Sequence, residues 1–449
     1  MNKATSSNRD FQEDIKELYN FYIKHLKERI LPFWLNNSPD YSFGGFYTCF
    51  DNYGRRLLST DKYTWSQGRM LWVLCKLYSS SIFTEEEKKE FFVLAARGAE
   101  FLMDNCLLED GSCSFILSAE GEPKKQRAED DFSYSIYADC FVVLGLSAYL
   151  GITGDTRSYS FLKKLYPSIV KRIEENSFKS EPYPVPKGYK SHGIPMILLN
   201  ISYEYASALK KINKELYEEV NDVGNRAMEE IMEEFLQEDG LIREMIKTDR
   251  AYLENLPLES SLWKGEDSNN LLTDYVNPGH SLEDMWFVIL QAKRSKREDI
   301  VRKAVEVIER TLDIGWDKEY DGLLLFSSAK GGRPQGSLQG IELEAMTEKV
   351  LKDWDSKLWW VHSEALYASL LAYSYENKEE QWHNFKKLHH YTFRTFPSAD
   401  EEPREWIQIR DRKGAPEEKL VALPVKDPFH IMRNIILIIE LLEKINKGK

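Results

Sequence analysis

The spacing of its helical segments constrains the fold of this chain more than any other feature. Apolar residues recur at the i, i+3, i+4 and i+7 positions of twelve segments, a pattern that predicts helices with one buried face. The predicted helices cover residues 11–31, 65–79, 85–104, 132–150, 157–175, 194–210, 214–237, 280–294, 297–312, 359–376, 378–394 and 428–446. The gaps between these helices alternate between short and long along the chain.

The short gaps lie near residues 80–84, 151–156, 211–213, 295–296 and 377, and the long ones cover 32–64, 105–131, 176–193, 238–279, 313–358 and 395–427. Connections between packed helices usually take about 2–8 residues, so six long loops require an explanation. A chain that runs up and down six times places every long loop at one end and every tight turn at the other. Six helix pairs closed in a ring form an all-α, double-layered (α/α)6 barrel, and we predict one such domain over residues 1–449. An open α-solenoid is the alternative, and it predicts loops of more even length.

Short β segments are expected inside the long loops, at 44–50 (GGFYTCF) and 322–326 (GLLLF).

Composition excludes several classes of partner. The formal net charge is −13 and no basic stripe is visible, which argues against binding to nucleic acid or an anionic membrane. The N-terminal residues lack the apolar region of a signal peptide, and no apolar run approaches the roughly 18 residues needed to span a bilayer. The five cysteines are odd in number and form no CxxC motif, so we expect reduced core thiols and a cytoplasmic location rather than disulfides or a zinc site.

Two of the 8 histidines lie in the same local motif about 150 residues apart: 277–280 read NPGH and 427–430 read DPFH. In each motif the Asx residue is placed to cap a helix, the proline to occupy its first position, and the histidine to lie in its first turn. The positive end of the helix dipole disfavours imidazolium there. We therefore expect His280 and His430 to hold neutral imidazoles that accept a proton near pH 7. Two capped helices with incidental histidines are the alternative.

Each histidine has a charged residue one turn further along its helix. Glu283 is the expected orienting partner of His280, and the charge of Arg433 is expected to disfavour imidazolium at His430. Other polar residues near the starts of helices that follow long loops are Arg69, His192 and His362. All of them are therefore expected on one rim of the barrel.

Two stretches supply further candidates. KLWWVHSEAL at 357–366 contains Trp359, whose ring suits the apolar face of a pyranose, together with His362 and Glu364. KYTWSQGRMLW at 62–72 begins with a predicted capping box from Thr64 to Gln67 and carries Trp65 and Arg69; the arginine could polarise a substrate carbonyl. No HExxH motif, Walker sequence or GxGxxG motif is present, so neither a metal nor a nucleotide cofactor is predicted.

These stretches resemble the signature segments of the N-acylglucosamine 2-epimerase family, with which the renin-binding proteins are classed. The order and spacing agree nearly end to end. The matching segments are FWLNNSPDYSFGGFYTCF (33–50), KYTWSQGRMLWVLCKLY (62–78), IPMILLN (194–200), NPGHSLEDMWF (277–287), GWDKEYDGLLLF (315–326), KLWWVHSEAL (357–366) and FHIMR (429–433). The family fold is an (α/α)6 barrel, in agreement with the alternation of loops.

The resemblance implies a division of roles among the candidates. His280 and His430 would be the catalytic acid/bases, with Arg69 and Glu283 also in the active site. We expect the substrate to be bound by His362, Glu364, Trp359, Asn200 and Trp65. Related sugar isomerases carry a H-x-H-x-x-E pattern on the sixth helix and have Glu where this chain has Asn200, which favours an epimerase. The chain departs from the family at LPVKDP (423–428), at EWIQIR (405–410) and in a longer loop before NPGH. The resemblance therefore defines the reaction more closely than it defines the substrate.

The function implied is a sugar 2-epimerase that interconverts N-acyl-D-glucosamine and N-acyl-D-mannosamine. Inversion at C2 of the open-chain aldehyde needs a base on each face, which two histidines can supply. No metal or redox cofactor is then required. The resemblance also suggests a homodimer and ATP as an allosteric effector. The alternatives are an aldose–ketose isomerase, a glycoside hydrolase using Glu283 and Glu364, and a non-catalytic binding protein.

Overall fold

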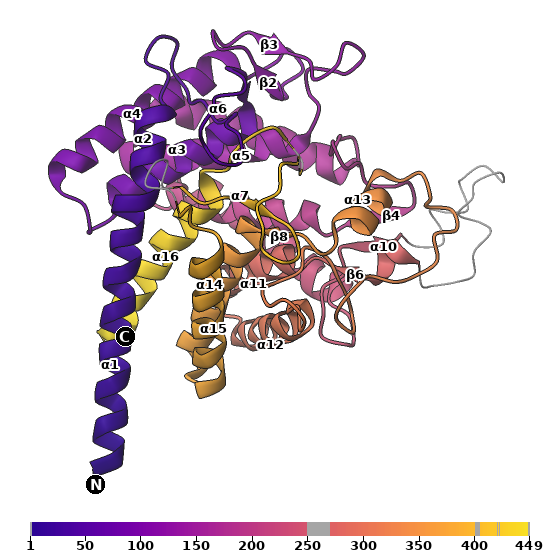
Figure 1. The fold of residues 1–449 in the computed structure, drawn as a ribbon. Coiled ribbons are helices and arrows are strands. Elements are labelled where there is room, and N and C mark those ends of the chain that lie inside the picture. The colour runs from indigo at the N-terminus through magenta and orange to yellow at the C-terminus, as the bar shows by residue number, and fades with distance from the viewer. Residues whose placement is uncertain (1, 249–269, 400–404, 420, 422, 448–449) are drawn as a thin grey trace.

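The computed structural model describes residues 2–248, 270–399, 405–419, 421 and 423–447. Long helices dominate these residues and alternate between two layers (Figure 1). The inner layer consists of α3 (Thr64–Ser79), α5 (Ile136–Thr153), α7 (Gly193–Leu209), α11 (Pro278–Arg294), α14 (Trp359–Glu376) and α16 (Phe429–Asn446). The outer layer consists of α1 (Asn2–His25), α4 (Glu85–Asn105), α6 (Thr156–Glu174), α8 (Lys214–Glu230), α12 (Glu298–Gly315) and α15 (Glu379–Thr395).

Contacts between the inner helices close the ring. Each of α3, α5, α7, α11, α14 and α16 packs against the next, and α16 packs back onto α3. Figure 1 shows the consequence for the chain ends, because α16 (yellow) runs beside α1 (indigo). The predicted (α/α)6 barrel is therefore confirmed, and the open solenoid is wrong.

Burial separates the two layers as the sequence pattern requires. Helices α5 and α14 are buried on nearly every side, whereas α12 buries one apolar stripe and exposes its charged face. Helix α5 is 18 residues long with a mean hydropathy of 1.6, which by length and composition would suffice to cross a membrane. The expectation that no apolar run approaches this length is thus wrong. Its residues are 67% buried and pack against α3 and α7, so its apolar character is accounted for by the barrel core.

Helix boundaries differ from prediction where the backbone departs from α geometry. The predicted helix 11–31 is α1 followed by a π-helical turn, η1 (Leu26–Ile30), and then α2 (Leu31–Asn37). A second π-helical turn, η2 (Ile231–Phe235), extends α8. Two helices that were not predicted, α10 (Leu271–Asp274) and α13 (Ala345–Asp353), lie within long loops.

The strands lie in other places than those predicted. Segments 44–50 and 322–326 make only isolated bridges, such as Pro39 with Phe46 and Trp316 with Leu323. The strands of the described residues are β1 (Lys62–Tyr63), β2 (Ile116–Leu117), β3 (Pro123–Lys124), β4 (Tyr189–Ser191), β5 (Met245–Lys247), β6 (Tyr275–Val276), β7 (Ser327–Ser328), β8 (Lys357–Leu358) and β9 (Ile409–Arg410). Four of them, β1, β4, β6 and β8, immediately precede an inner helix, and each pairs with a strand of the next long loop.

These pairings join the six long loops into a continuous rim. Antiparallel pairs connect β1 to β2, β4 to β5, β6 to β7 and β8 to β9, and a bridge between Ser135 and Ser180 connects the second and third loops. Asn52 of the first loop closes the ring by donating from Nδ2 to the carbonyl oxygens of Ile409 (2.9 Å) and Glu417 (3.0 Å) of the last. The rim surrounds the N-terminal ends of the inner helices and places their first turns in one region.

Buried lysines hold two of these loops in equivalent ways. Lys62 Nζ lies 2.7 Å from both Asp40 Oδ2 and the Gly44 carbonyl oxygen. Lys357 Nζ lies 3.0 Å from Asp317 Oδ2 and also donates to the Gly322 carbonyl. Each lysine precedes an inner helix, so its charge ties the start of that helix to the loop before it. The five cysteines are free and buried, as expected of core thiols.

Candidate active site

A cavity of about 290 Å³ opens at the rim, where the inner helices begin. Every inner helix contributes side chains to its wall. These include Trp65 and Arg69 of α3, Tyr137 and Phe141 of α5, Met196 and Asn200 of α7, His280 and Glu283 of α11, Trp359 and Trp360 of α14, and His430 and Arg433 of α16. Seven predicted site residues thus meet in one cavity: Trp65, Arg69, Asn200, His280, Glu283, Trp359 and His430. Their catalytic and binding roles remain predictions.

His280 is held at the start of α11 by two acceptors. Asn277 is the N-cap, as predicted, and its Oδ1 accepts the backbone N–H of His280 at 3.2 Å. The ring Nδ1 lies 2.8 Å from Glu244 Oε1. The predicted partner Glu283 is wrong, because it pairs with Arg433 instead. Glu244 was missed because it lies 36 residues away and reaches His280 only through the pairing of β4 with β5.

The charge state expected for His280 is also corrected. Burial disfavours the imidazolium, but the neighbouring carboxylate of Glu244 outweighs burial and raises the pKa of His280 above its usual value. The dipole of α11 is therefore a smaller influence than one carboxylate in direct contact. The same effect holds the pKa of Glu244 far below its ordinary range despite burial, because both His280 and His192 face it.

His192 lies behind Glu244 and is completely buried. Its Nε2 is 2.8 Å from Asp284 Oδ2, and its Nδ1 is 3.7 Å from Glu244 Oε2. Burial opposes protonation, but Asp284 and Glu244 together raise the pKa of His192 to about 9. His192 does not line the cavity, whereas its partner Glu244 does.

His430 is the counterpart of His280 on α16. The helix begins at Phe429 with Pro428 as its cap residue, one position later than the motif predicts. Asp427 nevertheless accepts the backbone N–H of His430 at Oδ2 (3.0 Å). The ring Nδ1 lies 2.7 Å from Glu364 Oε1. Each histidine thus has a carboxylate on Nδ1, and no partner for Nε2 is found among the described residues, so Nε2 is the nitrogen left for a substrate.

Glu364 is a buried support and does not line the cavity. Besides His430, it accepts hydrogen bonds from Trp286 Nε1 (2.9 Å), Arg433 Nη2 (2.5 Å) and Asn434 Nδ2 (2.6 Å). Burial raises the pKa of the carboxyl, but Arg433 and His430 outweigh this and lower it to about 2. Its predicted contact with substrate is therefore wrong, and its position suits the orientation of His430.

Arg433 occupies the centre of a potential metal-binding cluster. One oxygen each of Glu283 and Glu364 and one ring nitrogen of His430 lie within 4.8 Å of one another. The Nη2 atom of Arg433 donates to both carboxylates at this place. The guanidinium of Arg433 thus already supplies a cation to the two carboxylates.

His362 lies outside the cavity, although the sequence predicts it in the site. Its Nδ1 lies 2.7 Å from the Leu358 carbonyl oxygen, and its Nε2 accepts the backbone N–H of Leu323 at 2.9 Å. Burial lowers its pKa to about 3, so the ring is neutral at pH 7. It does not line the cavity, and its predicted role in substrate binding is wrong because both nitrogens hold backbone.

Arg69 enters the cavity beside the helix that carries His430. Its Nη1 lies 3.5 Å from Asp427 Oδ1, and its guanidinium packs over the ring of Phe141 at 4.1 Å. The predicted capping box before it is wrong: Thr64 hydroxyl donates to the Ser114 carbonyl, and Gln67 bonds the backbone of Phe46. The start of α3 is therefore fixed by neighbouring loops rather than by its own side chains.

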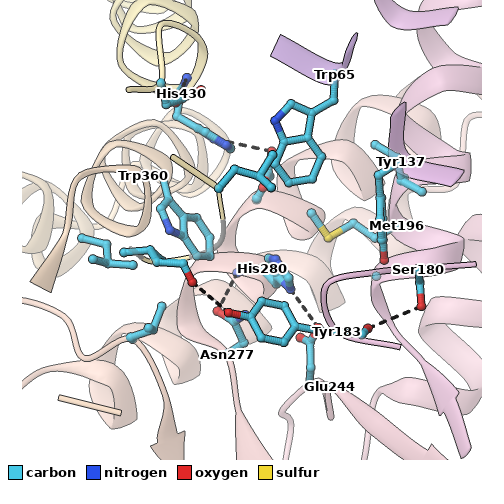
Figure 2. Close-up of a pocket in the computed structure, with 18 of the residues that line it drawn as sticks. Trp65, Tyr137, Ser180, Tyr183, Met196, Glu244, Asn277, His280, Trp360 and His430 are labelled. Carbon is cyan, nitrogen blue, oxygen red and sulfur yellow. Dashed lines mark hydrogen bonds and ion pairs between the residues drawn. The ribbon is translucent and has the colours of Figure 1, made fainter. Parts of the chain in front are cut away.

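Two tryptophans of α14 also line the cavity. Trp359 Nε1 donates to Asp427 Oδ2 at 3.0 Å. The ring of Trp360 lies 5.3 Å from that of His280 and 5.8 Å from that of His430, so it packs near both histidines. Figure 2 shows Trp360 and both histidines around the cavity, with Trp65 across from them. Aromatic faces and polar edges of this kind suit a sugar ring.

Comparison with known proteins identifies the family of this chain. The family model for N-acylglucosamine 2-epimerase (GlcNAc 2-epimerase) matches residues 45–433. The chain is 30% identical over 426 residues to the N-acylglucosamine 2-epimerase of Bos taurus, which covers 93% of this chain and 90% of that protein. A solved sugar epimerase from a ruminal bacterium has a TM-score of 0.70 at 18% identity, covering 94% of this chain and 98% of that one. A solved D-mannose isomerase has a TM-score of 0.71 at 17% identity, covering 94% and 97%.

The closed barrel, the paired histidines and these matches define a carbohydrate isomerase of the epimerase type. The chain belongs to the N-acylglucosamine 2-epimerase family. The solved structures support the barrel fold.

Proposed function

We propose that this protein interconverts N-acyl-D-glucosamine and N-acyl-D-mannosamine by inversion at C2 of the open-chain sugar. The observation that carries the proposal is the pair His280 and His430, which line one cavity with each Nδ1 on a carboxylate. The indole of Trp360 lies near both rings, 5.3 Å from His280 and 5.8 Å from His430. Two imidazoles so arranged can serve opposite faces of one carbon.

The chemistry proceeds in two proton transfers. In the open-chain aldehyde, one histidine removes the C2 proton through Nε2, and the electron pair moves into an enolate whose negative charge rests on the C1 oxygen. Arg69, which lines the cavity, is the cation suited to stabilise this oxyanion. The other histidine then returns a proton to the opposite face of C2, which restores the aldehyde with inverted configuration. The N-acyl group stays on C2 throughout.

An aldose–ketose isomerase is the second candidate, because a D-mannose isomerase shares the fold. In that reaction the proton returns to C1 and a ketose forms. Asn200 lines the cavity where the resemblance places glutamate in such isomerases, which favours the epimerase. A glycoside hydrolase would need two carboxylates facing the substrate. Glu364 is completely buried and bonded to four donors, so Glu283 and Glu364 do not form such a pair.

The proposed function extends to cofactors, location and assembly. It requires no metal or redox cofactor, because two bases and an arginine suffice for the proton transfers. We place it in the cytoplasm, which agrees with five free thiols. A homodimer and regulation by ATP are further proposals that rest on family resemblance. Light scattering measures the mass of the particle in solution and so tests the dimer. Epimerisation rates measured with and without ATP test the regulation.

The test is proton NMR of N-acetyl-D-mannosamine and N-acetyl-D-glucosamine in deuterated water with wild-type enzyme, His280→Asn and His430→Asn. Wild type should exchange C2 of both sugars and form no ketose. Each variant should lose net epimerisation by about 10²–10⁴-fold. Each should still wash deuterium into one sugar, and the two sugars should be opposite epimers, because a single remaining base returns a deuteron to the face it deprotonates. Near-normal turnover by either variant would make that histidine a cap residue, and deuterium at C1 with a ketose product would favour the isomerase.

A further inference from the structure

The carboxylate of Glu244 connects two imidazoles that come from different parts of the barrel. Its Oε1 lies 2.8 Å from His280 Nδ1, and its Oε2 lies 3.7 Å from His192 Nδ1. The first distance is a hydrogen bond and the second an ion pair. His192 Nε2 in turn lies 2.8 Å from Asp284 Oδ2. The four side chains form a continuous series that ends on the ring of His280.

Regular backbone holds this series in place. The pairing of Ser191 in β4 with Met245 in β5 brings the neighbouring residues His192 and Glu244 together. The backbone N–H of His192 donates to the Glu244 carbonyl oxygen at 2.9 Å. Asp284 lies on α11, one helical turn beyond His280, and is completely buried. Both ends of the series are thus fixed to secondary structure rather than to a free loop.

The charges along the series are coupled. Burial disfavours a charged His192, but Asp284 and Glu244 raise its pKa to about 9, so this ring is a cation at neutral pH. Burial likewise disfavours a charged Glu244, but its two imidazole neighbours lower its pKa and keep it ionised. Glu244 therefore presents a carboxylate to His280 while a fixed cation holds its other oxygen. Among the described residues, the other titratable groups that face this series are the hydroxyls of Tyr137 and Tyr275 and the carboxyl of Glu283.

The second histidine is supported differently. Glu364, the carboxylate on His430, also accepts from Arg433, Trp286 and Asn434. Three donors other than the histidine compete for Glu364. The two acid/bases of the proposed reaction are therefore not equivalent, although their sequence motifs are alike.

We infer that Glu244 is a positioning residue for His280, and that His192 and Asp284 hold it in place. Its carboxylate keeps the hydrogen of the neutral ring on Nδ1 and leaves the Nε2 lone pair for the C2 proton. It also stabilises the imidazolium that forms once that proton is taken. This inference rests on the proposed epimerase, because it concerns one of the two faces of C2.

The test compares C2 deuterium exchange from each epimer in wild type, Glu244→Gln and His280→Asn. Glutamine keeps the size of the side chain and removes its charge. Glu244→Gln should slow exchange from the same epimer that His280→Asn affects, by about 10²-fold or more, while exchange from the other epimer stays within a few-fold. The loss should be in kcat more than in KM. The pH–rate profile of the affected epimer should move to lower pH, because Glu244 is the group that raises the pKa of His280.

Glu234→Gln is the matched control. Glu234 lies 2.7 Å from Lys190 of β4, on a half-exposed ion pair near the same hairpin, and should leave both exchange rates unchanged. Equal slowing of both epimers by Glu244→Gln, or no effect on either, would overturn the inference. If the variant does not fold, ¹⁵N NMR of wild-type histidines decides: a neutral His280 with its hydrogen on Nε2 contradicts the inference, and hydrogen on Nδ1 supports it. A wild type that exchanges neither epimer would refute the proposed function, whereas the NMR result for the tautomer would stand independently.

Discussion

Gly279 and Trp360 pack so closely that a β carbon on Gly279 would lie 2.2 Å from the indole Cζ3. Only a glycine leaves room for this contact. Because the indole lies 5.3 Å from the ring of His280 and 5.8 Å from that of His430, the residue before His280 sets the position of an aromatic surface near both acid/bases.

Gly279→Ala should therefore displace Trp360. We expect the free energy of unfolding to fall by about 1–3 kcal/mol from overpacking. Epimerisation should fall on the order of 10²-fold, because a shift of about 1 Å at a reacting centre has that effect. Gly151→Ala in α5 is the control, since its nearest neighbour would be 3.8 Å away and helical alanine is favoured by up to about 1 kcal/mol. Denaturant unfolding and exchange rates measure both variants, and an active, stable Gly279→Ala would contradict the packing argument.

Arg433→Met should destabilise the fold strongly. The guanidinium pairs with Glu283 and Glu364, and both pairs are buried. Replacement removes the buried partner of Glu283 and one of the four donors of Glu364, and breaking a buried ion pair typically costs about 3–5 kcal/mol. Arg310→Met removes a half-exposed pair with Asp313 and should change stability by less than about 1 kcal/mol. Urea denaturation distinguishes the two, and similar midpoints for both variants would show that Arg433 is not needed to balance the cluster.

Chelation should leave epimerisation intact. Glu283, Glu364 and His430 have the spacing of a metal site, but Arg433 Nη2 donates to both carboxylates there. A divalent ion would have to displace this guanidinium. Dialysis against EDTA followed by the exchange assay is the measurement. Activity that disappears and returns only with a divalent cation would overturn the expectation.

The protonation of His192 should make stability depend on pH. Its pKa is raised from 6.5 to about 9 by Asp284 and Glu244 against the effect of burial. Because the pKa is raised in the folded state, protonation of His192 adds about 3 kcal/mol to the free energy of unfolding. This contribution is fully present below about pH 6.5 and is lost as the pH rises through about 9. Wild type should lose this stability between those values, and His192→Gln should show a flatter profile. His383→Gln, at an exposed histidine of α15, should retain the wild-type profile. Parallel curves for wild type and His192→Gln would show that His192 is neutral.

Much of the fold follows from local patterns that the sequence contains. Helix periodicity predicts α3, α7 and α14 to within about a residue at each end, because one helix buries a face set by its own side chains. The alternation of loop lengths predicts the rim and so brings Arg69, His280 and His430 to one end. The Asn-Pro-x-His motif correctly predicts the cap of His280, since a cap depends on residues within one turn.

The partners of the site residues were decided only by the tertiary structure. Glu283 and Glu244 are both acidic, and nothing local distinguishes which one reaches His280. The pairing of β4 with β5 brings Glu244 to Nδ1, while Arg433 of α16 draws Glu283 away. These contacts join segments far apart in the chain, and the charge of an imidazole depends on the group that touches it more than on the dipole of its helix.

His362 is a residue that the sequence pattern assigns to the site and the tertiary structure removes from it. Its place near the start of α14, on the correct rim, gives it the sequence pattern of a site residue. Only the position of the Leu323 backbone, brought in from the preceding long loop, turns the ring into a support for that loop. The sequence by itself thus determined the barrel and the end of it that holds the cavity, because helices and gaps are local properties. The tertiary structure determined which polar groups face the cavity, because burial and pairing depend on what the folded chain packs against each side chain.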